Sequence, residues 1–505
     1  MSMTILHGYV RRAVATVLGT TLALAASASW AQSESTYFVT STGAAGPGTL
    51  PDVIAQMQPT GTQILRFQLP PNSEIVLLGS PGTLRGIDIV VDGSDVPGLV
   101  INGNGTATIF RAPSAQTVTV RNVILRNGRG PGAGCLSSNA TLSTQVFDSQ
   151  FINCRTDGTP ASGSSGGAVF AFGPLRLTRT YFEGNIAADG GIDNLGLGGG
   201  AVAVSGTSVL IENTRFVNNL TLRTPNSFGG CTDGLGGALI MSLASGASAT
   251  LTGVSFTGNS NRCGTATGAV SGQAGALSVL GPGSGTAPFV ALDSTFFGGN
   301  LADNGAAIFA RAVQLTATNS TFHQNIGRGA GAIFLTTGFG ASPPTPELRL
   351  QSSTFWRNGT SFGNFGADLT LNAAVIVRAM RNVLFAAPTS GGSCAPASFN
   401  ADTGDVVFTT GTTCFVTVAG NNITAQFADG NSFGLQAPAD NGGVVPTLDL
   451  APGSVAIDNG TNVACPPRDA RNVVRPFDGD ANGVATCDVG SIEFRPNALF
   501  SNGFE

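Results

Sequence analysis

Residues 319–334 read NSTFHQNIGRGAGAIF and join a Phe-x-x-Asn tetrapeptide to a glycine-alanine turn. A pattern that recurs along a chain indicates a repeat architecture and has to be sought before any single element is assigned. Phe-x-x-Asn begins at Phe182, Phe216, Phe256, Phe297, Phe322 and Phe355, and at Phe151 with Cys154 in the asparagine slot. Glycine-alanine motifs begin at Gly166, Gly199, Gly236, Gly275, Gly305, Gly331 and Gly366.

Each repeat has a constant part and a variable part. The constant part alternates apolar and polar residues up to the phenylalanine, as in VQLTATNSTF at 313–322. Alternation of this kind, rich in β-branched residues, predicts a strand. No helical pattern separates the strands, so the sequence predicts an all-β fold, a single-stranded right-handed parallel β-helix, or solenoid.

In such a solenoid equivalent residues of successive coils lie above one another at the strand spacing of ~4.8 Å. The phenylalanines are then expected to stack inside, and the asparagines to form a ladder of side-chain amides. His323 occupies a slot of the repeat that holds Ile, Glu, Val, Thr, Gly and Trp in the other copies. A slot that varies so widely indicates a structural position.

Composition excludes some partners. Charged residues are 10% of the chain, the formal net charge is −5, and all 24 basic residues are arginine. Nucleic-acid binding needs clustered positive charge, so nucleic acid is not expected as a partner. No transmembrane segment is expected in the mature chain.

Residues 1–31 have the pattern of a secretory signal peptide. Arg11 and Arg12 precede an apolar run, Ala13–Ala28, and small residues flank Trp30 before Gln32. A membrane anchor is the alternative, but the run is shorter than the ~20 residues of a span. We expect export to the exterior or the outer membrane of a Gram-negative bacterium.

The eight cysteines are an even number, which in an exported protein favours disulfides. Zinc is the alternative, but neither CxxC-like spacing nor accompanying histidines are present. Pairing by proximity in sequence predicts Cys135–Cys154, Cys231–Cys263, Cys394–Cys414 and Cys465–Cys487.

The pattern also divides the mature chain. Residues 32–84 are expected to form an N-terminal cap and the first strands, with a short helix whose N-cap is Thr49 and whose Asp52 lies three residues on. The parallel β-helix is assigned to 85–430. A small C-terminal domain at 431–494 and a tail at 495–505 follow.

These motifs resemble known families. The alternating GGA and FxxN motifs resemble polymorphic outer-membrane protein repeats. Asp440–Thr447, Leu450–Asp458, Arg471–Pro476 and Cys487–Glu493 together resemble the choice-of-anchor Q domain of bacterial surface proteins. The resemblance implies an exported β-helix at the cell surface.

The sequence Asp478-Gly-Asp-Ala-Asn-Gly483 places oxygen side chains at positions 1, 3 and 5 of a tight loop, with Asp488 at position 11. Calcium prefers six to eight oxygen ligands in loops with this spacing. The sequence therefore offers Asp478, Asp480, Asn482 and Asp488 as calcium ligands. An acidic surface turn is the alternative.

Two functions remain open. The first is a non-catalytic scaffold, adhesin-like, that binds glycans or cell-surface components through loops at Ile186–Leu197, Leu220–Leu235 and Ser260–Ala274. The second is a polysaccharide lyase or glycoside hydrolase of the pectin-lyase-like fold, an analogy that fold alone does not establish. Its catalytic candidates are Asp368, which replaces an apolar residue and is expected to turn outward, with Arg349, Arg378 and the neighbouring Arg357 and Arg381. A solvated polar edge is the alternative for this group.

Overall fold

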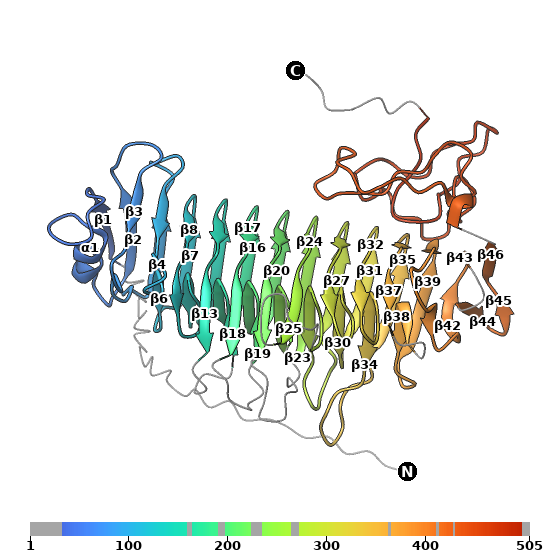
Figure 1. Ribbon diagram of the computed structural model, residues 1–505, viewed down its shortest axis with the longest axis horizontal. Coiled ribbons are helices and arrows are strands. Elements are labelled where there is room, and N and C mark those ends of the chain that lie inside the picture. The colour runs from blue at the N-terminus through green and yellow to red at the C-terminus, as the bar shows by residue number, and fades with distance from the viewer. Residues whose placement is uncertain are drawn as a thin grey trace, which may run out of the picture.

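A computed structural model of the protein describes residues 33–158, 164–189, 197–223, 235–263, 272–361, 365–410, 414–427 and 430–496. The expected signal peptide and residues 497–505 of the tail lie outside this part. The described chain forms a rod of stacked coils with one short helix at its N-terminal end (Figure 1). In that part no helix is long and apolar enough to cross a membrane.

Sheet A has two columns of strands. The first column contains β6 (Phe110–Ala112), β10 (Leu136–Ser138), β15 (Val169–Phe172), β26 (Leu277–Leu280), β30 (Ile308–Arg311), β34 (Ile333–Thr336), β38 (Gly366–Leu371) and β41 (Gly392–Ala395). The second contains β1 (Glu34–Val39), β2 (Thr62–Phe67), β4 (Asp88–Asp92), β7 (Thr117–Arg121), β11 (Ser143–Phe147), β16 (Leu175–Thr178), β27 (Phe289–Asp293), β31 (Gln314–Thr318), β35 (Glu347–Gln351), β39 (Ile376–Arg381), β42 (Ser398–Gly404), β44 (Phe415–Val418) and β45 (Asn421–Asn422). Two long strands span both columns, β20 (Val202–Glu212) and β23 (Leu239–Thr252).

Sheets B and C complete each coil. Sheet B contains β3 (Glu74–Val76), β5 (Val100–Asn102), β8 (Ile124–Arg126), β12 (Gln150–Ile152), β17 (Tyr181–Glu183), β21 (Arg215–Val217), β24 (Ser255–Thr257), β28 (Phe296–Gly298), β32 (Thr321–His323), β36 (Thr354–Trp356), β40 (Val383–Ala386), β43 (Val407–Thr410) and β46 (Thr424–Phe427). Sheet C contains β9 (Arg129–Gly130), β13 (Arg155–Gly158), β18 (Ile186–Asp189), β22 (Leu220–Arg223), β25 (Ser260–Cys263), β29 (Leu301–Ala302), β33 (Ile326–Gly327) and β37 (Gly359–Thr360). A separate pair is formed by β14 (Ser164–Gly166) and β19 (Leu197–Gly199).

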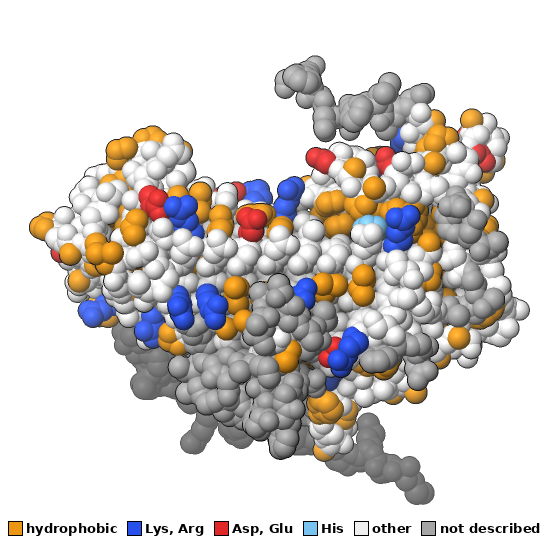
Figure 2. Space-filling view, viewed as in Figure 1, with side chains coloured by type: hydrophobic (Ala, Val, Ile, Leu, Met, Phe, Trp, Pro, Cys, Tyr) orange, Lys and Arg blue, Asp and Glu red, His pale blue; other side chains and the backbone are white. Residues whose placement is uncertain are grey.

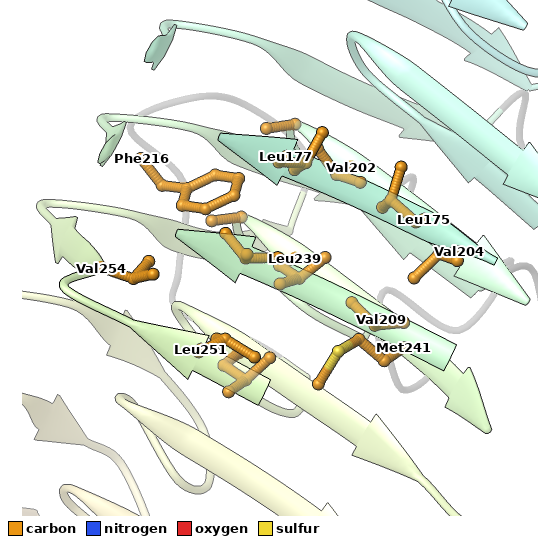
Figure 3. Close-up of a cluster of buried hydrophobic side chains, with 14 of the residues drawn as sticks. Leu175, Leu177, Val202, Val204, Val209, Phe216, Leu239, Met241, Leu251 and Val254 are labelled. Atoms are coloured by element: carbon orange, nitrogen blue, oxygen red, sulfur yellow. The ribbon is translucent and has the colours of Figure 1, made fainter. Parts of the chain in front are cut away.

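Parallel pairing in register confirms the predicted solenoid. Among the described strands, only β44 and β45 pair antiparallel. Figure 3 shows how apolar side chains of successive coils fill the interior, with Leu177, Val202 and Leu239 among them. The motif phenylalanines stack in one file through the core, with centroids of neighbouring rings 4.5 to 5.1 Å apart from Phe151 to Phe355.

The predicted helix is α1 (Leu50–Gln56), which lies at the N-terminal end of the rod (Figure 1). Leu50, Val53 and Ile54 are buried in the same core as the coils, so the helix covers the apolar interior there. Thr49 is the N-cap residue, but its hydroxyl donates back to the Gly46 carbonyl instead of capping the helix. Asp52 accepts a hydrogen bond from the Gly48 amide at 2.9 Å.

The C-terminal segment, residues 431–494, folds back beside the rod (Figure 1). It begins at a 3-10 helix, η1 (Gly430–Phe433), and contains no other helix or named strand. Phe433, Leu448 and Ile492 pack with Trp356, Leu384 and Phe408 on the outer face of sheet B in a second apolar cluster. The segment is therefore docked on the side of the rod over its last coils.

Three of the predicted disulfides are present: Cys135–Cys154, Cys394–Cys414 and Cys465–Cys487. Cys263 is also disulfide-bonded. Its predicted partner, Cys231, lies outside the described residues.

Candidate functional site

The motif asparagines form a buried ladder along the rod. Each side-chain Nδ2 donates to the Oδ1 of the asparagine in the next coil, at 2.8 to 3.0 Å, from Asn185 to Asn358. The same Nδ2 also donates to a phenylalanine carbonyl of the preceding coil, as Asn259 does to Phe216 at 3.0 Å. The Asn185 Oδ1 accepts from the amide of Cys154, the residue that replaces asparagine in the first copy. The constant spacing of Phe and Asn in successive copies of the motif thus supports the packing of the coils.

Asp368 ends this ladder. Its Oδ1 accepts the amide of Asn358 at 2.9 Å, and the side chain is fully buried. Pairing between β38 and β41 is irregular between Gly366 and Leu369, which leaves Asp368 as an extra residue beside the ladder. The expectation that Asp368 turns outward was wrong, because the last asparagine has no further asparagine to bond and this carboxyl replaces it.

Burial raises the pKa of Asp368 from 3.8 to about 7, against the opposing effect of hydrogen bonds from Asn358 and Ser393. A carboxyl with such a pKa has the electrostatics of a catalytic acid. It is enclosed, however, and no substrate reaches a side chain that is 0% exposed. Its role in this position is to satisfy the ladder.

The candidate arginines face elsewhere. Arg349 and Arg378 both pair with Glu347, at 3.4 and 2.7 Å, and Arg378 also pairs with Asp402. The remaining two are likewise engaged: Arg381 pairs with Asp405, and Arg357 lies 4.4 Å over the Trp356 ring. The proposed catalytic group is therefore not assembled around Asp368.

His323 is 6% exposed and stacks on Trp356 with centroids 4.8 Å apart. Burial lowers its pKa to about 4, so the imidazole is neutral at physiological pH. This placement agrees with the structural position that the repeat predicts.

Three carboxylates gather in the acidic loop of the C-terminal segment. Oxygens of Asp458, Asp478 and Asp480 lie within 4.8 Å of one another. Backbone amides already bond them: Asp458 accepts from Gly479 and Asp480, and Asp478 accepts from Asn482 and Gly483. These three side chains could hold a hard cation, but with one oxygen from each they supply three of the six to eight ligands that calcium takes.

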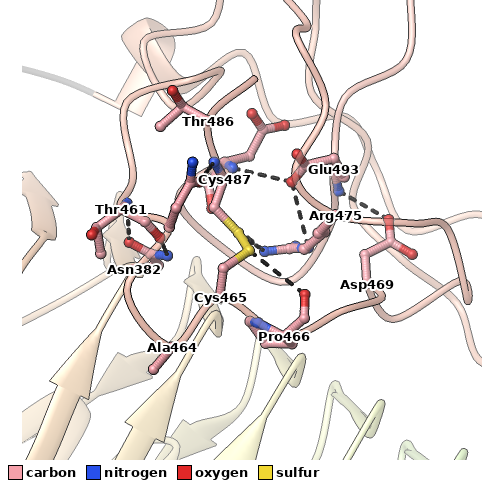
Figure 4. The surroundings of a disulfide bond; sticks show 12 residues. Asn382, Thr461, Ala464, Cys465, Pro466, Asp469, Arg475, Thr486, Cys487 and Glu493 are labelled. Carbon is pink, nitrogen blue, oxygen red and sulfur yellow. Dashed lines mark hydrogen bonds and ion pairs between the residues drawn. A yellow bond between two sulfur atoms is a disulfide. The ribbon is translucent and has the colours of Figure 1, made fainter. Parts of the chain in front are cut away.

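Asp488 does not belong to that group. Its carboxylate accepts from the backbone amides of Asp458 and Phe494, and the side chain is 1% exposed. It lies in a buried ionic cluster in which Arg475 pairs with Glu493 at 3.5 Å, beside the disulfide Cys465–Cys487 (Figure 4). Burial is the main cause that raises the pKa of Asp488 and of Glu493. The charge of Glu493 raises the pKa of Asp488 further, the charge of Asp469 does the same to Glu493, and Arg475 lowers both.

The outer surface carries two adjacent rows along the rod, here called the flank rows. One row is a single register position at the end of ten strands that run through the second column of sheet A, together with Arg66, the residue before the last in β2. The register aligns Arg66, Asp92, Arg121, Phe147, Thr178, Glu212, Thr252, Asp293, Thr318, Gln351 and Arg381. The other row is the residue that follows at the turn into sheet B, and each member has positive φ: Asn122, Asp148, Arg179, Asn213, Gly253, Ser294, Asn319, Ser352 and Asn382.

The C-terminal segment forms a wall over part of these rows. Asn319 donates to the Arg468 carbonyl, Asn382 to that of Thr461, and Gln351 to that of Ala464. Between wall and rod lies a groove of about 900 Å³, the flank groove. A shallower hollow of about 480 Å³ lies on the same rows near the N-terminal end, at Arg66, Arg121 and Asp148.

Figure 2 shows the upper edge of the molecule hollowed between the N-terminal coils and the C-terminal segment, with acidic and basic side chains along it. The flank groove was not foreseen in the sequence. Small polar residues and glycine do recur at the turn after each strand. Left-handed backbone favours these residues whether or not the turn is exposed, so the pattern does not by itself predict a groove. The wall opposite is visible only in the tertiary structure.

No family model, curated protein or solved structure matches this chain in the comparisons made.

Proposed function

We propose that the protein is an exported, non-catalytic β-helix scaffold, released from or held at the surface of a Gram-negative bacterium. In this proposal the solenoid is a rigid rod of the type that carries polymorphic outer-membrane protein repeats, and residues 431–494 act as a choice-of-anchor Q-like module. The disulfides support an oxidising destination. The signal-like residues 1–31 support export.

The observation that carries the non-catalytic part is the placement of Asp368. Asp368 is the carboxyl that the sequence offers as a catalytic group, and inside the core it accepts a hydrogen bond from the Asn358 amide. Hydrolysis of a glycoside needs two carboxyl groups about 5–10 Å apart across a bound sugar. In the described part of the flank groove, Asp469 is buried and paired with Arg471 at 2.8 Å, which leaves Asp293 as an exposed carboxylate without a second one.

The polysaccharide lyase or hydrolase is the alternative function, and it rests on fold analogy alone. The insertion loops at 186–197, 220–235 and 260–274 lie largely outside the described residues. They remain a proposal for adhesion to glycans or cell-surface components.

The test is cell fractionation joined to a product assay. The full chain, expressed with its own leader, is expected in the outer-membrane or culture-fluid fraction, and purified residues 32–505 are expected to leave polysaccharides uncut. New reducing or unsaturated ends that disappear in a heat-denatured control would establish the enzyme instead. Retention of the protein in the cytoplasm would remove the export proposal.

A further inference from the structure

The flank groove has the form of a binding site for a linear ligand. It follows the flank rows, in which each coil contributes equivalent positions at ~4.8 Å intervals. The groove is lined by row residues of five successive coils, from Asn213 to Gln351, so it extends for roughly 19 Å along the rod. Its volume of about 900 Å³ is at the upper end of the ~300–1,000 Å³ range of ligand sites.

The groove offers side-chain hydroxyl and amide groups. Asn213 and Thr252 are exposed in it, and Thr318 and Gln351 are partly exposed. The backbone amides of the turn row are already used, because each donates to the next coil, as Asn213 does to Thr252 at 2.9 Å. What remains for a ligand are the hydroxyls of Thr252 and Thr318, the side-chain amide of Asn213 and the side-chain oxygen of Gln351, whose NH2 bonds Ala464. Such groups suit the hydroxyls of a sugar.

A peptide strand is a poorer fit. Peptides that bind by backbone pairing add to an exposed strand edge. The strands that border the groove, β23, β27 and β31, each pair with a neighbour on both sides. They leave no free edge for a peptide to extend.

The charges of the flank rows cancel. Arg66 and Arg121 pair with Asp92, at 3.6 and 2.8 Å. Arg179 pairs with Asp148 at 2.6 Å. In the flank groove itself two acids, Asp293 and Asp469, accompany two bases, Arg468 and Arg471. A polyanion gains affinity from unpaired cations, and the described residues of the rows supply no excess of them.

We propose that the flank groove binds a neutral polysaccharide chain, which lies along the rod between the coils and the C-terminal segment. This proposal rests on the proposed function of the rod as a non-catalytic scaffold, and it names the ligand class and the surface. Contact is made by side-chain hydroxyls and amides, and binding is insensitive to ionic strength because the ligand is uncharged and the acids and bases of the groove are equal in number.

The experiment is affinity electrophoresis of residues 32–505 in native gels that contain dextran, mixed-linkage β-glucan or galactomannan, with polygalacturonate as the anionic comparison. The variant Thr252→Arg fills the groove from an exposed position, in a row that already holds arginine at Arg66 and Arg121. Thr318→Arg is the second blocking variant. Thr257→Arg is the matched control, an exposed threonine on the outer face of sheet B.

The site is supported if at least one neutral polymer retards the wild type and Thr257→Arg, and if both blocking variants bind that polymer at least tenfold more weakly. The retardation should also be unchanged by 0.5 M salt, which shortens the screening length to ~3–5 Å. Equal retardation of all four proteins overturns the groove while the scaffold function stands. Failure of the wild type to bind any of the three neutral polymers, or tighter binding to polygalacturonate, overturns the ligand class. New reducing ends would overturn the non-catalytic function, and the blocking variants would still decide the place of binding.

Discussion

Asn358 donates its side-chain amide to the carboxyl of Asp368 at 2.9 Å, and this bond closes a ladder that begins at Asn185. Both residues are 0% exposed. Asp368, which the sequence marks as anomalous because it has a carboxyl in place of an apolar side chain, is thus the last acceptor of the asparagine ladder. The relationship has consequences that experiments can measure.

The first prediction concerns pH. Burial raises the pKa of Asp368 from 3.8 to about 7, so its contribution to stability is fully present below pH ~4 and is lost as the pH rises toward 7. That loss is on the order of 4 kcal/mol for a shift of ~3 pKa units. Asp368→Asn keeps an acceptor for Asn358 and is expected to flatten the dependence, with a higher stability than the wild type at pH 8. Urea unfolding at pH 4, 6 and 8 measures it.

The control for that measurement is Asp440→Asn, an exposed carboxyl at a surface turn. It is expected to leave the pH dependence of the wild type unchanged. An unchanged slope in Asp368→Asn as well would show that Asp368 does not carry the titration.

The second prediction concerns the ladder. Asn259→Ala removes an amide that bonds Asn219, Asn300 and the Phe216 carbonyl. A buried polar group without a partner costs ~1–3 kcal/mol, so the variant is expected to lose at least ~3 kcal/mol. Thr257→Ala, two residues away and exposed, is expected to change stability by less than ~0.5 kcal/mol. Thermal unfolding by circular dichroism compares them, and similar melting temperatures would contradict the ladder's role.

The third prediction concerns the disulfide Cys465–Cys487, which closes a loop with a sequence separation of 22. Replacing both cysteines by serine is expected to destabilise the C-terminal segment by ~3 kcal/mol, because the unfolded loop gains entropy. Limited proteolysis should then cut within 431–494 while the coils resist. Cleavage at equal rates in variant and wild type would show that the bond does not stabilise the segment.

The fourth prediction concerns the ion pair of Arg475 and Glu493, both side chains being 0% exposed. Arg475→Met keeps most of the side-chain volume but leaves Glu493 and Asp488 without their cation. Loss of one partner from a buried pair costs ~3–5 kcal/mol. The double variant Arg475→Met with Glu493→Gln is expected to recover part of that cost, and denaturant unfolding of the single and double variants tests whether it does.

The fold could be predicted because each copy of the repeat makes the same side-chain contacts. All seven copies of the motif place one phenylalanine ring in the core, and the six that end in asparagine place one amide on the ladder, so each copy predicts the same local structure. The N-cap of α1 was located at Thr49, although its hydroxyl bonds Gly46. The repeat did not predict the candidate catalytic group, because Asp368 is an extra buried residue of β38, whereas Arg349 and Arg378 lie on β35 and β39 and pair with Glu347.

Sequence by itself determined the solenoid, the inward file of phenylalanines and the asparagine ladder, since these depend on local alternation and on equivalent residues in register. It also determined the capping helix and three observed disulfides, since these depend on residues close together in the chain. Tertiary structure alone decided that Asp368 points inward, that Asp458 and not Asp488 joins Asp478 and Asp480, and that residues 431–494 wall a groove on the flank. These depend on contacts between residues as far apart as Thr321 and Ser491, whose hydroxyls lie 2.8 Å from each other, and no spacing along the chain encodes such a distance.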